Sequence, residues 1–146
     1  MKLKPTTSTE TGHHSTACGT ATKAHRATRS GDIDPAIIPY IMRIEDLDAH
    51  EIERMLNKKS GAWGVSGVSE DYRDIEREYA NGDERSILAL DAQAYRIAQN
   101  IASYMVPLQG VDIITFSGGV GERGIQTRER ICKYLECFGI LLTIVG

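Results

Sequence analysis

The sequence predicts an α/β fold that is rich in helix and carries a βαβ unit at its C-terminal end. Apolar residues recur at three- and four-residue intervals from about 83 to 108, which is typical of one long helix with a buried face. Further on, the β-branched run VDIITF at 111–116 precedes a glycine turn, a helical pattern and a second β-branched run, ILLTIV at 140–145. Strand, turn, helix and strand in this order predict the βαβ unit.

Length and composition indicate a soluble globular chain of about one domain. The chain has 146 residues, of which 41% are hydrophobic and 25% charged, and its formal net charge is −3. Like charges form no block along it, so we expect neither nucleic acid nor a membrane surface as a partner. No apolar run approaches the ~20 residues that cross a bilayer, and the N-terminus lacks the apolar stretch of a secretory signal. We therefore expect a cytoplasmic protein.

Cysteine and histidine usage indicates neither a disulfide framework nor a metal site. The three cysteines, Cys18, Cys132 and Cys137, form no C-x-x-C pair, and His13 and His14 are adjacent to each other in a polar stretch. We expect free thiols and no metal ligand in this chain.

The first sixty residues predict an arm and two helices. Residues 1–28 have little apolar content beyond alanine and predict a poorly ordered arm. Asp34 and Pro35 predict an N-cap and the first residue of a short helix, followed by isoleucines at helical spacing. Asp48 and Glu51 predict a capping box at the start of the next helix. Apolar residues flank this cap as a hydrophobic staple requires, namely Leu47 and Ile52.

Glycines punctuate the rest of the chain. The second helix should stop near Gly61, and GAWGVSGVSEDYRDI at 61–75 predicts a glycine-spaced loop. TFSGGVGERG at 115–124 contains G-x-G-x-x-G, which occurs in Rossmann dinucleotide-binding units, in phosphate-binding turns of other folds and in tight turns without a ligand. A Rossmann unit also needs an acidic residue about 20 positions later, and ILLTIVG offers none.

Four stretches, in their order and at their separations, make the sequence resemble the acetate kinase family. They are TRSGDIDPAIIPYIM at 28–42, LNKKSG at 56–61, SGVSEDYRDI at 66–75 and TFSGGVGERG at 115–124. The likeness runs almost continuously from Thr28 to about Gly139. It implies that residues 29–146 are part of the C-terminal nucleotide-binding domain of such an enzyme, with an actin-like (ribonuclease H-like) fold shared with sugar kinases.

The resemblance also implies a set of site residues. Arg29, in the T-R-S-G-D motif, is implied to stabilise the phosphoryl group during transfer. The nucleotide-binding residues implied are Asp71, Tyr72 and Arg73 at the adenosine pocket, and Gly119, Val120, Gly121, Glu122 and Arg123 in the turn over the nucleotide. Arg123 departs from the asparagine that is usual in the family. Two simpler interpretations stay open: Arg29 as a surface or capping arginine, and Asp71 with Arg73 as a cap and ion pair at a helix start.

The implied reaction is reversible transfer of the ATP γ-phosphoryl group to acetate, which gives acetyl phosphate and ADP. Mg²⁺ is implied with ligands outside this chain, and the family forms homodimers. The alternatives are a propionate or butyrate kinase, and a non-catalytic module that binds nucleotide or self-associates through the helix at 84–108. An active site between two lobes needs both of them, so we expect the isolated chain to be inactive.

Overall fold

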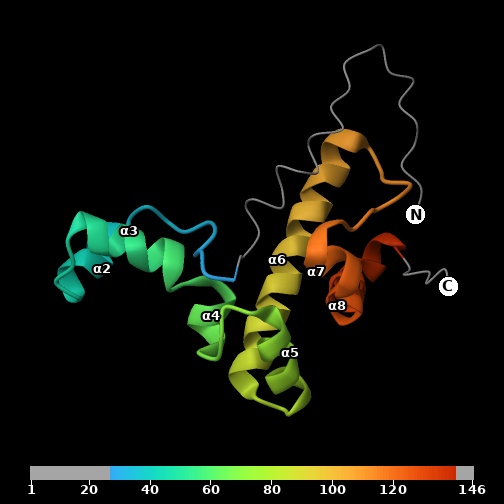
Figure 1. Ribbon diagram of the computed structural model, residues 1–146. Coiled ribbons are helices and arrows are strands. Elements are labelled where there is room, and N and C mark those ends of the chain that lie inside the picture. The colour runs from blue at the N-terminus through green and yellow to red at the C-terminus, as the bar shows by residue number, and fades with distance from the viewer. Residues whose placement is uncertain (1–26, 141–146) are drawn as a thin grey trace. The chain divides into compact units, whose positions relative to one another are not determined.

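The computed structural model describes residues 27–140, which divide into two compact units, 27–93 and 94–140, called here the N-terminal and C-terminal units. Each unit is described by itself. The elements, shown in Figure 1, are α2 (Ile37–Ile44), α3 (Ala49–Lys58), α4 (Gly61–Ser66), α5 (Tyr72–Ala80), α6 (Glu84–Leu108), α7 (Gly118–Arg123), α8 (Ile125–Leu135) and the short 3-10 helix η1 (Glu136–Phe138). The expected arm lies almost wholly outside the described residues.

The core of the N-terminal unit joins three helices. Side chains of α4, α5 and the first turns of α6 form a buried cluster of Ala62, Ile75, Ala89 and Leu90, against which Val65, Tyr72 and Tyr79 pack. These helices appear together around the start of α6 in Figure 1. α6 begins at Glu84, one residue after the predicted start. Its apolar residues recur at helical spacing, and those in its N-terminal part are buried in this cluster.

The core of the C-terminal unit lies between α8 and the later turns of α6. The buried residues are Ala94, Ala98, Ile131, Leu135 and Ile140, with Ile97, Ile101, Met105, Ile114 and Phe116 packed around them. An edge-to-face contact between Tyr95 and Tyr134, with ring centroids 5.4 Å apart, extends the same contact between the two helices. In this unit Cys132 and Cys137 are free thiols, as expected.

The capping box at α3 is confirmed. The Asp48 carboxylate accepts hydrogen bonds from the backbone N–H groups of His50 and Glu51, both at 2.8 Å, and Glu51 Oε2 accepts from the Asp48 N–H at 2.9 Å. Three N–H groups that the helix itself cannot pair, those of Asp48, His50 and Glu51, are thereby satisfied. Ile52, the predicted staple residue, is buried.

Removing this cap gives a stability prediction. Asp48→Ala is expected to lower the free energy of unfolding of the N-terminal unit by about 1 kcal/mol, because the helix start loses its acceptor. Urea denaturation followed by circular dichroism measures the change. Glu53→Ala, which removes an exposed acidic side chain from the same helix, serves as the control and should change stability by less than about 0.5 kcal/mol. Equal losses in the two variants would contradict the capping role.

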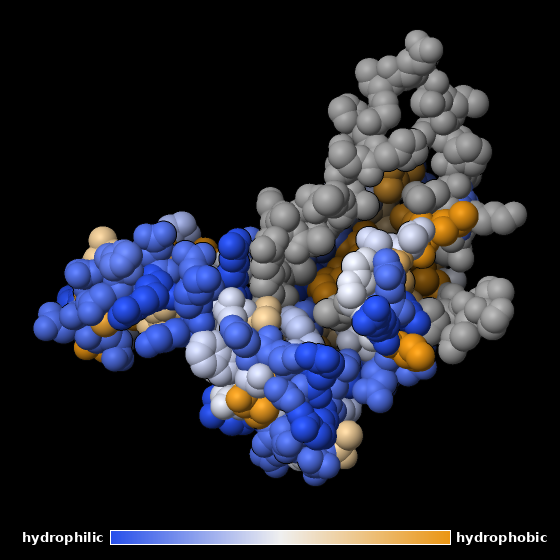
Figure 2. All heavy atoms as spheres, in the orientation of Figure 1, coloured by the Kyte–Doolittle hydropathy of each residue, from blue (hydrophilic) through white to orange (hydrophobic). Residues whose placement is uncertain are grey.

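The predicted start of α2 is wrong by two residues. The helix begins at Ile37 with Ala36 in the capping position, and Asp34 Oδ1 accepts instead from the Ala36 N–H at 2.9 Å. The cause is a tighter first turn, because Ile37 donates to the Asp34 carbonyl and Ile38 to the Pro35 carbonyl in i-to-i+3 bonds. Figure 2 shows the surface of α2 and α3 as largely hydrophilic with a few apolar spots. Three large side chains of α2 are exposed, namely Ile37, Tyr40 and Ile44.

The predicted loop at 61–75 is also wrong, because the segment contains α4 and the start of α5. Gly64 lies inside α4, where an added Cβ would come within 2.9 Å of the Lys59 carbonyl oxygen. Gly67 ends the helix in the left-handed region, at φ 72°. The two glycines therefore serve a close backbone approach and a helix end.

The predicted βαβ unit is not seen. Residues 111–116 form no strand, and no β-strand occurs anywhere within 27–140. A strand requires a hydrogen-bonded neighbour, and this segment instead packs Ile114 and Phe116 against the helical core while Ile113 is exposed. Most of the second predicted strand, 141–145, lies outside the described residues. The predicted glycine turn between the strands is the short helix α7.

None of the helices in the described part of the chain is both long enough and apolar enough to cross a membrane.

Candidate functional site

The backbone around Arg29 is fixed by hydrogen bonds to the end of α3, to Ser60 and to the start of α4. The three bonds are Ser30 N–H to the Leu56 carbonyl at 2.8 Å, Ser60 N–H to the Thr28 carbonyl at 2.9 Å, and Trp63 N–H to the Ala27 carbonyl at 2.9 Å. Two of the stretches that carry the family resemblance, TRSGD and LNKKSG, are therefore adjacent in space. The Arg29 side chain is exposed.

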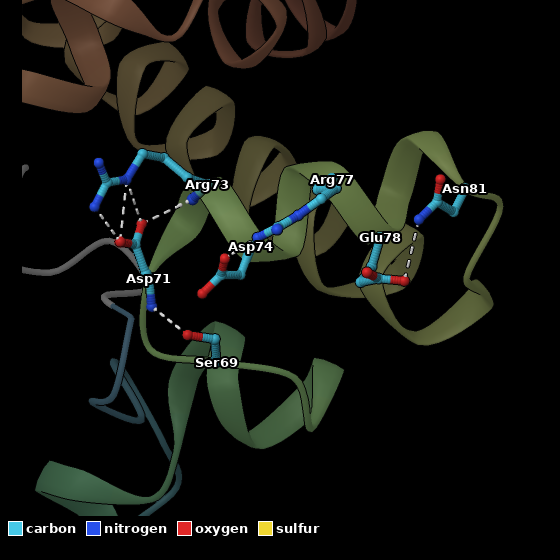
Figure 3. Close-up of polar contacts among 7 residues, drawn as sticks. All are labelled: Ser69, Asp71, Arg73, Asp74, Arg77, Glu78 and Asn81. Carbon is cyan, nitrogen blue, oxygen red and sulfur yellow. Dashed lines mark hydrogen bonds and ion pairs between the residues drawn. The ribbon is translucent and has the colours of Figure 1, made fainter.

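Asp71 and Arg73 form a closed corner at the start of α5 (Figure 3). The Asp71 carboxylate caps the helix by accepting from the Arg73 backbone N–H at 2.9 Å. The same carboxylate receives the Arg73 guanidinium, with Nε 3.0 Å from each oxygen and Nη2 2.5 Å from Oδ2. The Asp71 N–H in turn donates to Ser69 Oγ at 3.0 Å. This is the cap and ion pair that the sequence left open as the simpler interpretation.

The corner fixes the charge state of both groups. The hydrogen bond from the Arg73 side chain is the main reason that the pKa of Asp71 is lowered to about 2, and the ion pair raises the pKa of Arg73. A carboxylate with so low a pKa stays ionised near neutral pH and is a weak general base. Asp71 can therefore orient Arg73, whose side chain is 87% exposed, but is unsuited to removing a proton from a substrate.

Tyr72 differs from its two neighbours because its side chain faces the core. Its ring packs on the buried cluster of the N-terminal unit, and its hydroxyl accepts a hydrogen bond from Gln93 Nε2 at 2.5 Å. Burial raises the pKa of Tyr72 to about 12. The D-Y-R triplet thus combines one core residue with two residues at the surface.

The glycine turn lies in the C-terminal unit. Gly118 has a φ of 78°, which favours glycine, and α7 then runs through Gly119 to Arg123. At Gly121 an added Cβ would come within 3.3 Å of the Phe116 carbonyl carbon, so a larger residue would press against the preceding segment. A Cβ added at Gly119 would meet no other atom within 4 Å. The Gly119 backbone is therefore open to approach by a ligand.

Arg128 is a residue near the turn that sequence reasoning missed. From α8, its Nη1 atom donates to the carbonyl oxygens of both Gly121 and Glu122, at 2.7 Å each. The available signal was its position in the first turn of the helix that follows G-x-G-x-x-G, close enough in sequence to reach back. Arg123, which replaces the family asparagine, is exposed.

The candidate residues divide between the two units. Arg29 and residues 71–73 belong to the N-terminal unit, and residues 119–123 belong to the C-terminal unit. Their convergence around one nucleotide stays a prediction. Within 27–140, no group of three or more His, Cys, Asp or Glu side chains lies close enough together to hold a metal ion.

Comparisons with known proteins give a consistent match. A model of the acetokinase family matches residues 24–144. The acetate kinase of Treponema denticola is 52% identical over 115 residues, which are 79% of this chain and 29% of that protein. The propionate kinase of Yersinia enterocolitica is 48% identical over 115 residues, or 79% of this chain and 28% of that protein. The chain thus spans less than a third of the length of these relatives.

Solved structures match in three dimensions as well. The crystal structure of Porphyromonas gingivalis acetate kinase aligns with a TM-score of 0.75 and 45% identity, over 80% of this chain and 29% of that one. A propionate kinase from Francisella tularensis aligns with a TM-score of 0.75 and 36% identity, over 79% and 30% of the two chains. The fold described above is therefore the one found in the matching part of these kinases.

Proposed function

The chain belongs to the acetokinase family, and on this basis we propose that it carries part of the nucleotide-binding domain of an acetate kinase. The reaction is reversible transfer of the ATP γ-phosphoryl group to acetate, giving acetyl phosphate and ADP. The observation that carries the proposal is the match over residues 24–144, supported by 52% identity to an acetate kinase. The chain covers 29% of that enzyme, so the complete reaction needs parts that these residues do not supply.

Arg29 is proposed to stabilise the transferring phosphoryl group. Acetate is ionised at neutral pH, since a simple carboxyl group titrates near ~4 to 5, so the nucleophile needs no general base. Catalysis then depends on alignment and on neutralising the charge of the equatorial phosphoryl oxygens. A permanently charged, planar guanidinium suits this task, and the paired backbone on both sides of Arg29 holds its position.

The nucleotide is proposed to bind at the Asp71–Arg73 corner and at the glycine turn. Arg73 offers N–H donors at the surface and Asp71 orients them, whereas the hydroxyl of Tyr72 is engaged with Gln93. We therefore assign the adenosine contact in this triplet to Asp71 and Arg73, with Tyr72 supporting α5 from the core. At the turn, Gly119 leaves room for a ligand beside the backbone. When bound, Mg²⁺ would offset phosphate charge, but no step of this proposal passes through it.

Nucleotide binding by the chain tests this assignment. We expect a non-hydrolysable ATP analogue to bind in calorimetry and Arg73→Met to raise its dissociation constant about tenfold, because a charged donor is lost. Arg43→Met removes an exposed arginine from α2 in the same unit and should leave the dissociation constant unchanged. Failure to bind at millimolar analogue, or equal effects of the two substitutions, would contradict the assignment of Arg73.

The same samples, assayed for acetyl phosphate from ATP and acetate, are expected to show no turnover, because the chain covers 29% of a whole enzyme. Turnover would show that this chain is catalytically sufficient.

A propionate kinase is the second candidate, favoured by the 48% identity to the Yersinia enterocolitica enzyme. One methylene group in an apolar pocket is worth only ~1–3 kcal/mol of discrimination, so acetate and propionate are chemically close acceptors. Binding as a homodimer and a cytoplasmic location are part of the same proposal and follow from the family resemblance.

A further inference from the structure

The short helix α7 depends on a side chain from the next helix to satisfy its C-terminal carbonyl groups. A helix leaves its last four carbonyls without internal donors, and in a helix of six residues these are most of its acceptors. Arg128 Nη1 donates to two of them, the carbonyls of Gly121 and Glu122, at 2.7 Å each. A guanidinium at this end also interacts favourably with the helix dipole.

The residue that makes these bonds is itself held in place. α8 packs into the core of the C-terminal unit through Ile131 and Leu135, and Thr127 is buried beside Arg128 in the sequence. The Arg128 N–H donates to the Gly124 carbonyl at 3.0 Å, which fixes the first turn of α8 directly after α7. The core therefore holds the α8 backbone that carries Arg128, and the Arg128 guanidinium bonds to carbonyl groups of the glycine turn.

The N-terminal unit contains the same device, which argues against a chance contact. α4 is also a six-residue helix that contains glycine, and Arg85 from α6 donates through Nε to the Val65 carbonyl at 2.9 Å and through Nη2 to the Gly64 carbonyl at 3.5 Å. In both units an arginine of a longer helix holds the carbonyl end of a short one. Arginine suits this role because its donors form a rigid fork that never loses its charge.

We propose that Arg128 is a positioning residue for nucleotide binding, because it fixes the backbone of the α7 turn and with it the direction of the amides at Gly119 and Gly121. The inference rests on the proposed function of this turn in contacting ATP. Arg128 acts through the turn carbonyls and not through contact with the nucleotide. Without its two bonds, the turn is expected to open more often and to present its amides in the binding geometry less of the time.

Two measurements on the full chain test the proposal. Hydrogen exchange reports the opening of residues 118–124, and calorimetry with a non-hydrolysable ATP analogue reports binding. Arg128→Met should speed amide exchange across the turn at least about tenfold and raise the dissociation constant about tenfold. Arg128→Lys, which keeps the charge but not the guanidinium fork, should restore only part of the exchange protection and part of the affinity. Arg130→Met, which removes the same charge from the same helix, is the matched control and should change neither.

The outcomes separate this inference from the proposed function. Unchanged amide exchange in Arg128→Met, or equally faster exchange in Arg128→Met and Arg130→Met, would contradict the claim that Arg128 fixes the turn. Faster exchange with unchanged analogue affinity would overturn the role in binding. If the parent chain binds no analogue while exchange at the turn still depends on Arg128, the nucleotide function of the turn fails and its fixation by Arg128 stands.

Discussion

Replacing Ile75 with alanine is expected to lower the free energy of unfolding of the N-terminal unit by about 2–5 kcal/mol. Ile75 is 0% exposed, and two of its three partners in the buried cluster are alanines, Ala62 and Ala89. Such small neighbours have no flexible side chain with which to fill the space left by three carbon atoms. The loss should therefore include a cavity contribution in addition to the lost burial of the side chain.

Urea denaturation of both proteins, followed by circular dichroism, measures this loss. Ile44→Ala makes the same change at a position that is 60% exposed, and it should alter stability by less than about 0.5 kcal/mol. If the two substitutions lower the free energy of unfolding equally, Ile75 does not lie in the buried cluster where the structure places it.

The N-terminal unit is also expected to lose about 2–3 kcal/mol of stability between pH 10 and pH 12 through Tyr72. Burial raises the pKa of this phenol from 10.0 to about 12 in the folded chain, so the folded state keeps the proton more tightly than the unfolded state does. The resulting stability is complete below pH 10 and disappears as the pH rises through 12. The difference of two pKa units between the unfolded and folded states corresponds to about 2–3 kcal/mol, which is an upper bound on the stability that is lost.

Unfolding free energies measured at pH 9 to 12 in the parent and in Tyr72→Phe test this expectation. The difference between the two curves isolates Tyr72 from other groups that titrate at alkaline pH. The parent should lose more stability than Tyr72→Phe over this range. Parallel curves would show that the hydroxyl of Tyr72 is not buried beside Gln93.

Features encoded by local sequence were the ones that could be predicted. The capping box of Asp48 and Glu51 needs only residues three positions apart, and the apolar repeat recurs along a helix of 25 residues, so both were found. The predicted site residues came from the family resemblance. Where the structure places them, Arg73 and Asp71 lie at the surface and Tyr72 lies against the core, a division that the triplet itself does not reveal.

Features that depend on how segments pack against one another were missed. Glycine spacing at 61–67 resembles that of a loop, because nothing in the sequence shows that a Cβ added at Gly64 would come within 2.9 Å of the Lys59 carbonyl oxygen. Residues 111–116 have strand-forming composition, but a strand also needs a neighbour to pair with. The bonds from Arg85 and Arg128 to carbonyls follow from helix packing, which periodicity alone does not specify.

The division of α6 between two cores has a consequence for cooperativity. The buried clusters share no residue, and the helix contributes Ala89 and Leu90 to one and Ala94 and Ala98 to the other. Each cluster can act as a separate foldon, so a single melting temperature need not describe the chain. Loss of either foldon would leave only the part of α6 that packs in it without buried partners, so one end of the helix should fray while the other end stays folded.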